Sequence, residues 1–433
     1  MCYSVRGKVM SKVTPVPFVP TRIHIRDFGP IREADIHLGK VTILMGPNNT
    51  GKTYFTLLIP ALSELMREWR FARPLAVSLK FEPEEFTRYL EMKFGNIMQR
   101  LYAVNNPEDL IRRGSEKAQL RFELKPEGQA GEALELEVQI GKRSGIVSNF
   151  GGSSELFEGN KVPEIESVYI PAERSGLMRT YRQLLRLYVA TSWVGAPSQK
   201  RRFMQLMYDE IRIGAVRLFL DALLGMEKFT LEDREEAHVA HALDLLEREV
   251  LGGRLEMRED LSVRYYPIGA EKPIDLINAS AMVSELSAIY LLSGMLRKGW
   301  WLIIEEPEAH VHPRRQAMIA RFMAMLARLG VNVMATTHSD LIALKLAQMV
   351  GLTGLSPEER ERLGYRGDEY LTKEELALYA FEPEDGSIAR KVEVSETGEV
   401  SELPTYSNVL EEMYGEAVRL LELHGKILKV IEG

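Results

Sequence analysis

The sequence predicts an α/β fold: a mixed central sheet flanked by helices, with an antiparallel β-lobe and an inserted helical arm. Short apolar runs have the length and residue types of buried strands and precede helical patterns, at 41–45, 301–304 and 331–335. Alternating apolar and polar residues at 119–124 and 133–138 indicate half-exposed antiparallel strands. A helical pattern with polar breaks then follows from Ser175 to about Leu251, and we expect three helices there.

Composition and charge are ordinary for a globular protein. The chain has 433 residues, 45% of them hydrophobic and 27% charged, and this length predicts about two to three domains. The formal net charge of −7 disfavours bulk attraction to nucleic acid or an anionic membrane. The single cysteine, Cys2, fits a reducing compartment, and no apolar stretch is long enough to cross a bilayer. We therefore expect a cytoplasmic protein with no membrane contact.

The N-terminal region predicts a flexible leader followed by a compact sheet. Residues 1–20 lack the apolar core of a secretory signal, and the sequence leaves open whether translation starts at Met1 or Met10. Strands are then expected at 22–27, 33–38 and 41–45, with a turn at Phe28-Gly29-Pro30.

The strand at 41–45 runs directly into a glycine-rich loop, GPNNTGKT, and an apolar helical pattern follows from Tyr54. A strand before and a helix after is the context that a phosphate-binding loop requires. The loop's glycines let backbone N–H groups face the phosphates, and the helix dipole adds positive potential. We expect Lys52 to reach the β- and γ-phosphates of ATP and the Thr53 hydroxyl to bind Mg²⁺. The predicted ATP-binding residues are Gly46, Pro47, Asn48, Asn49, Thr50, Gly51, Lys52 and Thr53.

The strand at 301–304 ends in three carboxylates, Glu305, Glu306 and Glu308. Buried acids crowded at a strand end repel one another and lose hydration, which is costly unless a cation compensates them. Mg²⁺ bound to a nucleotide opposite Thr53 would provide that compensation. We expect Glu305 to hold the Mg²⁺ shell and Glu306 to polarise the attacking water. The alternative is a solvated loop after a strand.

The third apolar run, 331–335, continues into Thr336-Thr337-His338-Ser339, where the chain should turn into a helix. A histidine at this place could hydrogen-bond the γ-phosphate and sense its loss. A structural histidine is the alternative, but the two neighbouring motifs favour the functional one. We therefore predict Glu306, His338 and Lys52 as the catalytic residues.

In this order, the motifs resemble those of ABC-class ATPases of the SMC/RecF type, and look closest to the OLD-like (overcoming-lysogenisation-defect) branch. The segments that carry the resemblance are IRDFGPIREADIHL, GPNNTGKT, YIPAERSG, NASAMVSEL, IEEPEAHVHP and TTHSDL. The resemblance covers 20–175 and 260–433. It implies an ABC-type head that forms a head-to-tail homodimer around two ATP molecules. The Toprim nuclease domain of OLD-like nucleases is not recognisable after His338.

The resemblance also assigns roles to four less specific positions. Ser280 occupies the signature serine position, and would contact the partner subunit's γ-phosphate in trans, although the glycines that usually follow it are absent. Ser280 is also a good helix N-cap. Glu173 and Arg174 occupy the lid-loop position that usually carries glutamine, and either could contact the metal or the γ-phosphate. His310 falls near the dimer-contact loop, where it could also be a simple turn residue.

We predict four parts of the chain: the leader 1–20, an N-terminal part of the head with the β-lobe at 21–175, the helical arm at 176–258, and a C-terminal part of the head at 259–433. The arm carries basic residues that could contact DNA phosphates or form a solvated helix face, namely Arg179, Arg182, Arg186, Lys200, Arg201 and Arg202. Its Glu235, His238 and His241 have metal-like spacing, but a solvated face is favoured over a zinc site.

The residues and the resemblance together predict a Mg²⁺-dependent ATPase whose nucleotide closes and opens two heads. The resemblance places this activity in DNA repair or anti-phage defence, with a separate effector protein. One alternative is an ATP-gated scaffold that barely hydrolyses ATP. Another is a P-loop kinase for a small molecule, although the sequence shows no obvious lid or acceptor pocket.

Overall fold

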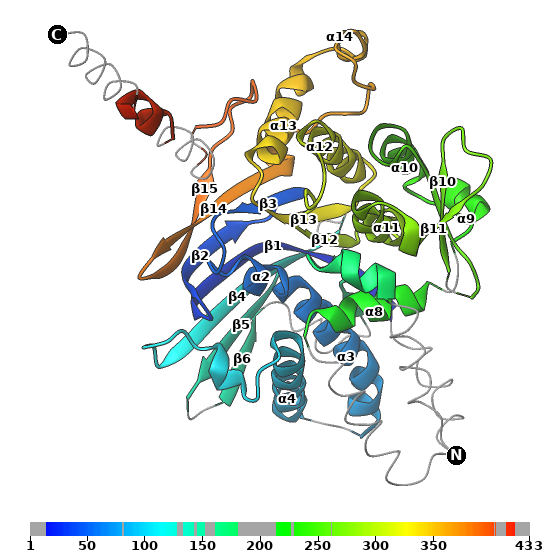
Figure 1. The fold of residues 1–433 in the computed structure, drawn as a ribbon. Coiled ribbons are helices and arrows are strands. Elements are labelled where there is room, and N and C mark those ends of the chain that lie inside the picture. The colour runs from blue at the N-terminus through cyan, green and yellow to red at the C-terminus, as the bar shows by residue number, and fades with distance from the viewer. Residues whose placement is uncertain are drawn as a thin grey trace, which may run out of the picture.

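The computed structural model describes residues 14–79, 82–127, 133–142, 145–151, 161–180, 214–226, 229–260, 262–401, 403 and 413–420. Their body is built on one mixed sheet of strand order β6-β5-β4-β1-β2-β15-β14-β3-β13-β12-β8, with β7 paired to β1 (Figure 1). Helices flank this sheet, and antiparallel strands form one end of it. The predicted α/β fold class with a mixed sheet is therefore confirmed.

Five neighbouring parallel strands form the buried part of the sheet. They are β14 (Leu376–Glu384), β3 (Val41–Met45), β13 (Asn332–Thr337), β12 (Trp301–Glu305) and β8 (Ser167–Ile170). Every residue of β3, β12 and β13 is buried. Strands covered on both faces need continuous apolar runs, and such runs were the sequence signal that predicted them.

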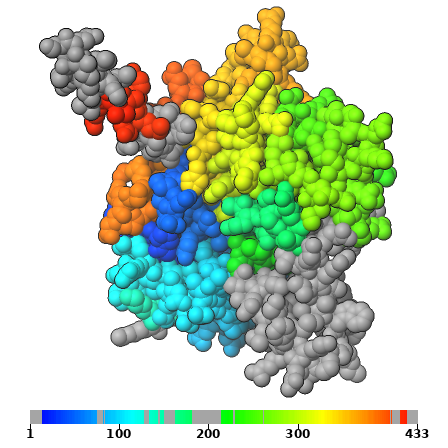
Figure 2. All heavy atoms as spheres, viewed as in Figure 1, coloured from blue at the N-terminus to red at the C-terminus, as the bar shows by residue number. Residues whose placement is uncertain are grey.

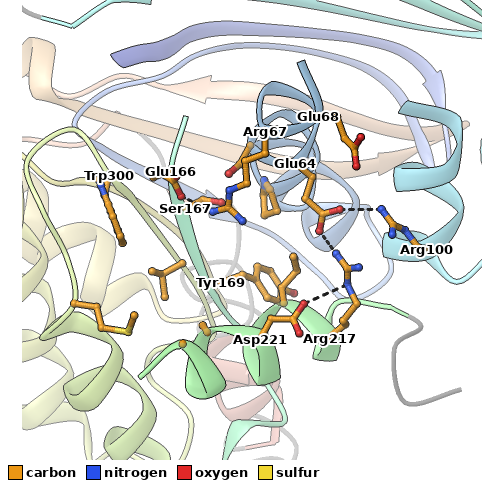
Figure 3. Close-up of a pocket in the computed structure, with 17 residues that line it drawn as sticks. Glu64, Arg67, Glu68, Arg100, Glu166, Ser167, Tyr169, Arg217, Asp221 and Trp300 are labelled. Atoms are coloured by element: carbon orange, nitrogen blue, oxygen red, sulfur yellow. Dashed lines mark hydrogen bonds and ion pairs between the residues drawn. The ribbon is translucent and has the colours of Figure 1, made fainter. Parts of the chain in front are cut away.

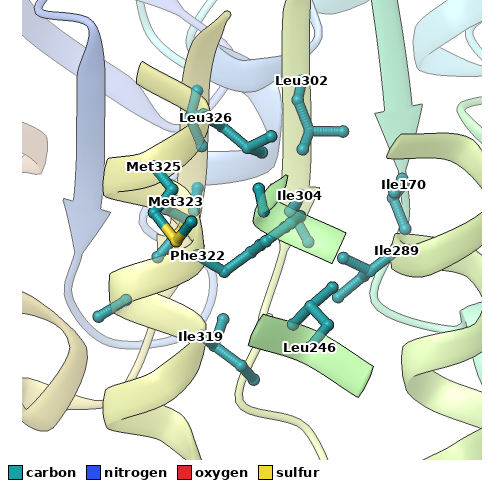
Figure 4. Packing of buried hydrophobic residues seen from close by; sticks show 14 of the residues in the cluster. Ile170, Leu246, Ile289, Leu302, Ile304, Ile319, Phe322, Met323, Met325 and Leu326 are labelled. Atoms are coloured by element: carbon teal, nitrogen blue, oxygen red, sulfur yellow. The ribbon is translucent and has the colours of Figure 1, made fainter. Parts of the chain in front are cut away.

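Helices cover both faces of the parallel strands. On one side lie α2 (Lys52–Thr56) and α3 (Leu58–Leu79), and on the other lie α11 (Ala281–Ser293), α12 (Pro313–Arg328) and α13 (Asp340–Gly351). Successive residues of a strand point to opposite faces, so β12 contributes to two separate cores. Leu302 and Ile304 pack towards Phe322 of α12 and Ile289 of α11 (Figure 4), whereas Ile303 belongs to the core beneath α3.

The antiparallel lobe extends the sheet on its other side. It consists of β1 (Thr14–Phe28), β2 (Ile31–His37), β4 (Lys117–Pro126), β5 (Leu134–Gly141) and β6 (Gly145–Gly151), with β7 (Lys161–Glu164) beside β1. Buried and more exposed residues alternate along β4 and β5, as the sequence predicted. The lobe packs on α4 (Pro83–Tyr102), and η2 (Pro107–Leu110) leads from α4 into β4.

The described part of the predicted arm packs onto the body. It contains α8 (Val216–Gly225), α9 (Leu231–Glu236), α10 (Ala240–Leu245) and a π-helical segment, η3 (Leu246–Leu251). Phe219, Leu223 and Leu246 share one hydrophobic core with α11 and α12. A small sheet of β9 (Gly253–Met257), β10 (Val263–Pro267) and β11 (Ile274–Asp275) follows. The basic residues predicted between 182 and 202 lie outside the described residues.

The remaining elements complete the C-terminal part. They are η4 (Leu276–Asn278), η5 (Leu352–Gly354), α14 (Pro357–Arg362), η6 (Lys373–Glu375) and β15 (Gly386–Val392). A hairpin turn joins β14 to β15. The described residues 413–420 are helical and stand out from the body (Figure 2). Within the described ranges, no helix combines the length and apolar character that a membrane span requires.

Replacement of Ile303 by alanine should lower the free energy of unfolding by about 2–5 kcal/mol, because it opens a cavity at a fully buried position. The matched control is Ile277→Ala, since Ile277 is 60% exposed, and there we expect a change within about 0.5 kcal/mol. Urea denaturation followed by circular dichroism measures both. Equal losses in the two variants would contradict the burial of Ile303.

Candidate functional site

The pairing of three parallel strands brings the predicted motifs to one edge of the sheet. Thr337 at the end of β13 pairs with Met45 at the end of β3, and Thr336 pairs with Glu305 at the end of β12. Because β13 lies between the other two strands, the segment that begins at His338 lies between the glycine-rich loop and the acidic strand end. Three segments far apart in the sequence therefore form one candidate site.

The glycine-rich loop has a backbone that requires its two glycines. Gly46 has φ 132° and Gly51 has φ 92°, values that side-chain-bearing residues rarely adopt. A Cβ atom at Gly46 would lie 2.4 Å from the carbonyl oxygen of Phe381 in β14. Thr50 stiffens the loop, since its hydroxyl donates to the Pro47 carbonyl at 2.9 Å. The exposed tip of the loop consists of Pro47, Asn48 and Asn49.

The ammonium group of Lys52 is folded onto this loop. Its Nζ donates to the carbonyl oxygens of Gly46 at 2.7 Å and Pro47 at 2.6 Å. Burial lowers the pKa of Lys52 to about 8, and the nearby carboxylates, Glu306 foremost, oppose that shift. The group can therefore supply positive charge to an anion that competes successfully with the two carbonyl oxygens.

The carboxylate of Glu305 is buried opposite the start of α2. Burial raises its pKa, while hydrogen bonds from the hydroxyls of Thr53 and Thr56 act in the opposite direction; the Thr56 hydroxyl lies 3.3 Å from Glu305 Oε1. The hydroxyl of Thr53 and the carboxylate of Glu305 are hard oxygen donors of the kind that Mg²⁺ prefers. No group of three or more His, Cys, Asp or Glu in the described residues could enclose a metal. Such an ion would therefore complete its shell with phosphate oxygens and water.

Glu306 has a strained backbone and an ionised side chain. Its φ of 46° lies in the left-handed region, which costs a residue with a long side chain about 1–3 kcal/mol. Its N–H donates to the Thr336 carbonyl at 3.0 Å. The proximity of His338 lowers the pKa of Glu306, since His338 Nε2 lies 3.6 Å from Glu306 Oε1. A charged base is thus held at the open edge of the site.

Two positions of the site had no assigned role in the sequence. The Glu308 carboxylate accepts a hydrogen bond from the backbone N–H of His338 at 2.7 Å. The next residue, Ser339, donates to Gln316 of α12 at 2.6 Å, and Gln316 in turn donates to the Val311 carbonyl. Glu308 was visible within the acidic run, whereas nothing in the local sequence distinguished Gln316.

The positions that were assigned by resemblance differ from one another in their exposure and their contacts. Ser280 is the N-cap of α11, as expected, and its hydroxyl accepts from the Val283 N–H at 3.3 Å. Glu173 is exposed, but Arg174 has no exposed surface. The guanidinium of Arg174 is enclosed by protein, and contact of Glu173 or Arg174 with the metal or the γ-phosphate stays a prediction. His310 has φ 57° and lies 3.8 Å from the carboxylate of Glu285.

A cavity of about 420 Å³ lies at the other end of the parallel strands, between α3 and α8 (Figure 3). It is lined by the start of β8 and by charged side chains that pair with one another. Glu64 binds both Arg100 and Arg217, and Glu166 binds Arg67. The charged side chains of this cavity are thus paired with one another. This pairing distinguishes the cavity from the sheet edge that carries Lys52.

The family comparison agrees with this geometry. Residues 41–344 match the model of the family described as "AAA domain, putative AbiEii toxin, Type IV TA system". The chain belongs to this AAA-domain family. The matched segment begins with β3 and ends within α13, so it includes the glycine-rich loop, the acidic end of β12 and His338. The fold and family of this AAA-domain protein are those of nucleotide-binding ATPases.

Several solved structures are similar to this AAA-domain protein. An Smc head bound to the C-winged helix domain of ScpA shares 12% identity, with 87% of this chain and 98% of that chain covered and a TM-score of 0.47. A Pyrococcus furiosus Smc head with an extended coiled coil shares 11%, with 92% and 100% covered and a TM-score of 0.45. The recombination mediator protein RecF shares 12%, with 87% and 98% covered and a TM-score of 0.40. No curated protein sequence matches significantly. The OLD-like branch stays a prediction.

The strain at Glu306 should reverse the usual ranking of alanine and glycine. The free energy of unfolding of Glu306→Gly should exceed that of Glu306→Ala by about 1 kcal/mol, because only glycine adopts φ 46° without strain. Position 308 is the matched control, since its φ is not positive, and there alanine should be the more stable by about 0.5–1 kcal/mol. Denaturation of the four nucleotide-free variants measures both differences. The same ranking at both positions would contradict the strain.

The lowered pKa of Lys52 predicts that ATP binds more weakly at high pH. The phosphates of ATP favour the charged ammonium of Lys52 and so raise its pKa in the complex. The resulting gain in ATP affinity is fully present below about pH 8 and is lost as pH rises through the pKa of the complex. Between pH 8 and 9 the Kd should therefore rise by up to about tenfold. Titration calorimetry should show proton uptake on binding in this range. Lys52→Arg, which does not titrate, is the control, and a constant wild-type Kd with no proton uptake would contradict the prediction.

Proposed function

We propose that this protein is a Mg²⁺-dependent ATPase. The observation that carries the proposal is the placement of the buried Glu305 of β12 against α2, the helix that begins at the glycine-rich loop. The Thr56 hydroxyl lies 3.3 Å from Glu305 Oε1, and the Thr53 hydroxyl lowers the pKa of the same carboxyl group. This placement joins a loop suited to phosphates to a buried carboxylate that a cation would stabilise. Glu306 and His338 lie beside it, as a water-activating base and a phosphate-sensing histidine require.

In the proposed reaction, ATP binds with its phosphates along the N–H groups of residues 46–53. Lys52 exchanges its two carbonyl partners for phosphate oxygens. Mg²⁺ held by Thr53 and Glu305 would supply charge stabilisation to the phosphates. Glu306 accepts a proton from the attacking water while the water oxygen forms a bond to the γ-phosphorus. At the same time, the bond between that phosphorus and the bridging oxygen breaks, and ADP leaves with that oxygen. His338 hydrogen-bonds the γ-phosphate and returns towards Glu306 after its release.

The conformational part of the proposal is a head-to-tail homodimer around two ATP molecules. Ser280 caps a helix with its hydroxyl at the helix N-terminus, where an anion from a partner subunit is favoured. ATP would join the two heads and hydrolysis would release them, which is a population shift driven by a ligand. DNA repair or anti-phage defence through a separate effector protein is the proposed setting. The family description names a component of a toxin–antitoxin system, which supports a separate partner.

A scaffold that binds ATP and barely hydrolyses it is the second candidate. The folding of Lys52 onto its own loop favours this candidate, because Lys52 can stabilise charge on the γ-phosphate only after it leaves two carbonyl oxygens. A nucleotide bound with Lys52 still on the loop would be hydrolysed slowly. A P-loop kinase would be supported instead if ATP consumption required a particular small acceptor and gave its phosphorylated product.

Replacement of Glu306 by glutamine separates the ATPase from the scaffold. The ATPase proposal predicts that phosphate release falls by at least about 100-fold, since the amide cannot accept the proton from water, and that dimers accumulate with ATP. Phosphate release and light scattering after gel filtration, with and without ATP and Mg²⁺, measure the two effects.

Glu358→Gln is the matched control, because it removes one exposed carboxylate on α14 away from the site. It should leave both hydrolysis and dimer formation unchanged. Phosphate release at background level in both wild type and Glu306→Gln would refute the ATPase and leave the scaffold. Equal release above background would refute the role of Glu306 as the base.

A further inference from the structure

One buried arginine contacts the two carbonyl groups that flank the catalytic end of β12. Arg174 follows β8, and its guanidinium has no exposed surface. One terminal nitrogen donates to the Glu305 carbonyl at 2.6 Å and the other donates to the Glu306 carbonyl at 2.9 Å. Its Nε donates to the Glu285 carbonyl in α11 at 3.2 Å. A single side chain thus joins the acidic strand end to the helix that Ser280 caps.

We propose that Arg174 is a positioning residue that holds Glu306 in its strained conformation and couples it to α11. The inference rests on the proposed ATPase function and deepens it, because it adds a control element for the same site. Arg174 does not act by contact with the carboxylate of Glu306, which would meet the water, or with the imidazole of His338, which would meet the phosphate. It acts through the backbone of Glu306.

The strain at Glu306 explains why such an anchor is needed. A residue at φ 46° relaxes unless the surrounding structure fixes it from both sides. The Thr336 carbonyl fixes the N–H of Glu306 and Arg174 fixes its carbonyl oxygen. Loss of either contact would let the peptide rotate and carry the carboxylate away from His338. A displacement of about 1 Å at a catalytic group can reduce the rate by about 100-fold.

The connection to α11 includes an ion pair as well as a hydrogen bond. Arg174 Nε lies 3.1 Å from Glu285 Oε2, and both side chains are buried. Arg179 holds the preceding turn, since it donates to the Ala279 carbonyl and the Ser284 hydroxyl. The first turns of α11 are therefore attached to the segment that carries Arg174. A shift of α11 when Ser280 meets a nucleotide would move Arg174, and with it the Glu306 carbonyl.

The chemistry of the contacts requires arginine at this position. The guanidinium presents rigid donors in a plane, and here its three nitrogens reach carbonyl groups in three different segments. A lysine keeps the charge but presents one nitrogen, which cannot reach the same carbonyl groups together. Arg174→Lys therefore removes the positioning geometry while it retains the charge opposite Glu285.

The test compares Arg174→Lys with Arg360→Lys. Arg360 is also buried and donates to three backbone carbonyls, those of Leu352, Thr353 and Gly367, far from the site. Matched losses of thermal stability are expected for the two variants. Only Arg174→Lys should lower kcat, by about 10- to 100-fold, with KM for ATP changed by less than about threefold, because the phosphate loop is intact.

Two further variants distinguish positioning from a general weakening of the fold. In a Glu306→Gln background, Arg174→Lys should leave the residual single-turnover rate unchanged, since it acts through Glu306. Glu285→Gln keeps the size of the side chain but removes the ion pair. It should lower kcat in the same direction, with no further loss when combined with Arg174→Lys. Glu285→Gln also keeps the inference testable if Arg174→Lys fails to fold.

The outcomes separate the inference from the proposed function. Absence of hydrolysis in the wild type would overturn the ATPase proposal and this inference with it. Wild-type hydrolysis with equal kcat in Arg174→Lys and Arg360→Lys would overturn the inference alone. Additive losses with Glu306→Gln would also overturn it, because Arg174 would then act by another route.

Discussion

The burial of Glu305 at the end of β12 is the constraint on which the rest of the site depends. A carboxylate in that position loses hydration, so it must receive hydrogen bonds or a cation. The structure provides the hydroxyls of Thr53 and Thr56, both in α2. They can approach only because β13 pairs with β3 and β12 in a register that aligns the three strand ends. The arrangement of the sheet and the electrostatics of one side chain therefore support each other.

The charges around Glu305 are balanced by different means. Glu306 keeps its charge beside His338, at the open edge, and Lys52 is satisfied by carbonyl groups of its own loop. Arg174 directs its donors to the backbone behind the acidic residues, where burial is complete. The strained peptide of Glu306 lies between these groups. Its geometry thus depends on contacts from β13 and from the segment after β8, which are distant in sequence.

Much of this arrangement could be predicted from local sequence patterns. Buried strands, the glycine-rich loop and the alternating strands of the β-lobe each have a periodicity or a motif of their own. The positive φ of Glu306 and the packing of Phe219 into the core of α11 and α12 have none, because tertiary contacts determine them. The same reason explains the burial of Arg174. Its place in the motif suggested contact with a ligand, whereas its burial follows from α11, which lies more than 100 residues later.

The hydrogen bonds of Lys52 to its own loop have a consequence for selectivity. Any anion that enters must compensate the loss of two short contacts to backbone oxygens. Inorganic phosphate or sulfate would have only a few oxygens with which to do so, whereas a nucleotide adds binding surface elsewhere on the protein. The two contacts of Lys52 would therefore penalise a small anion more than a nucleotide, and this selectivity needs no additional side chain.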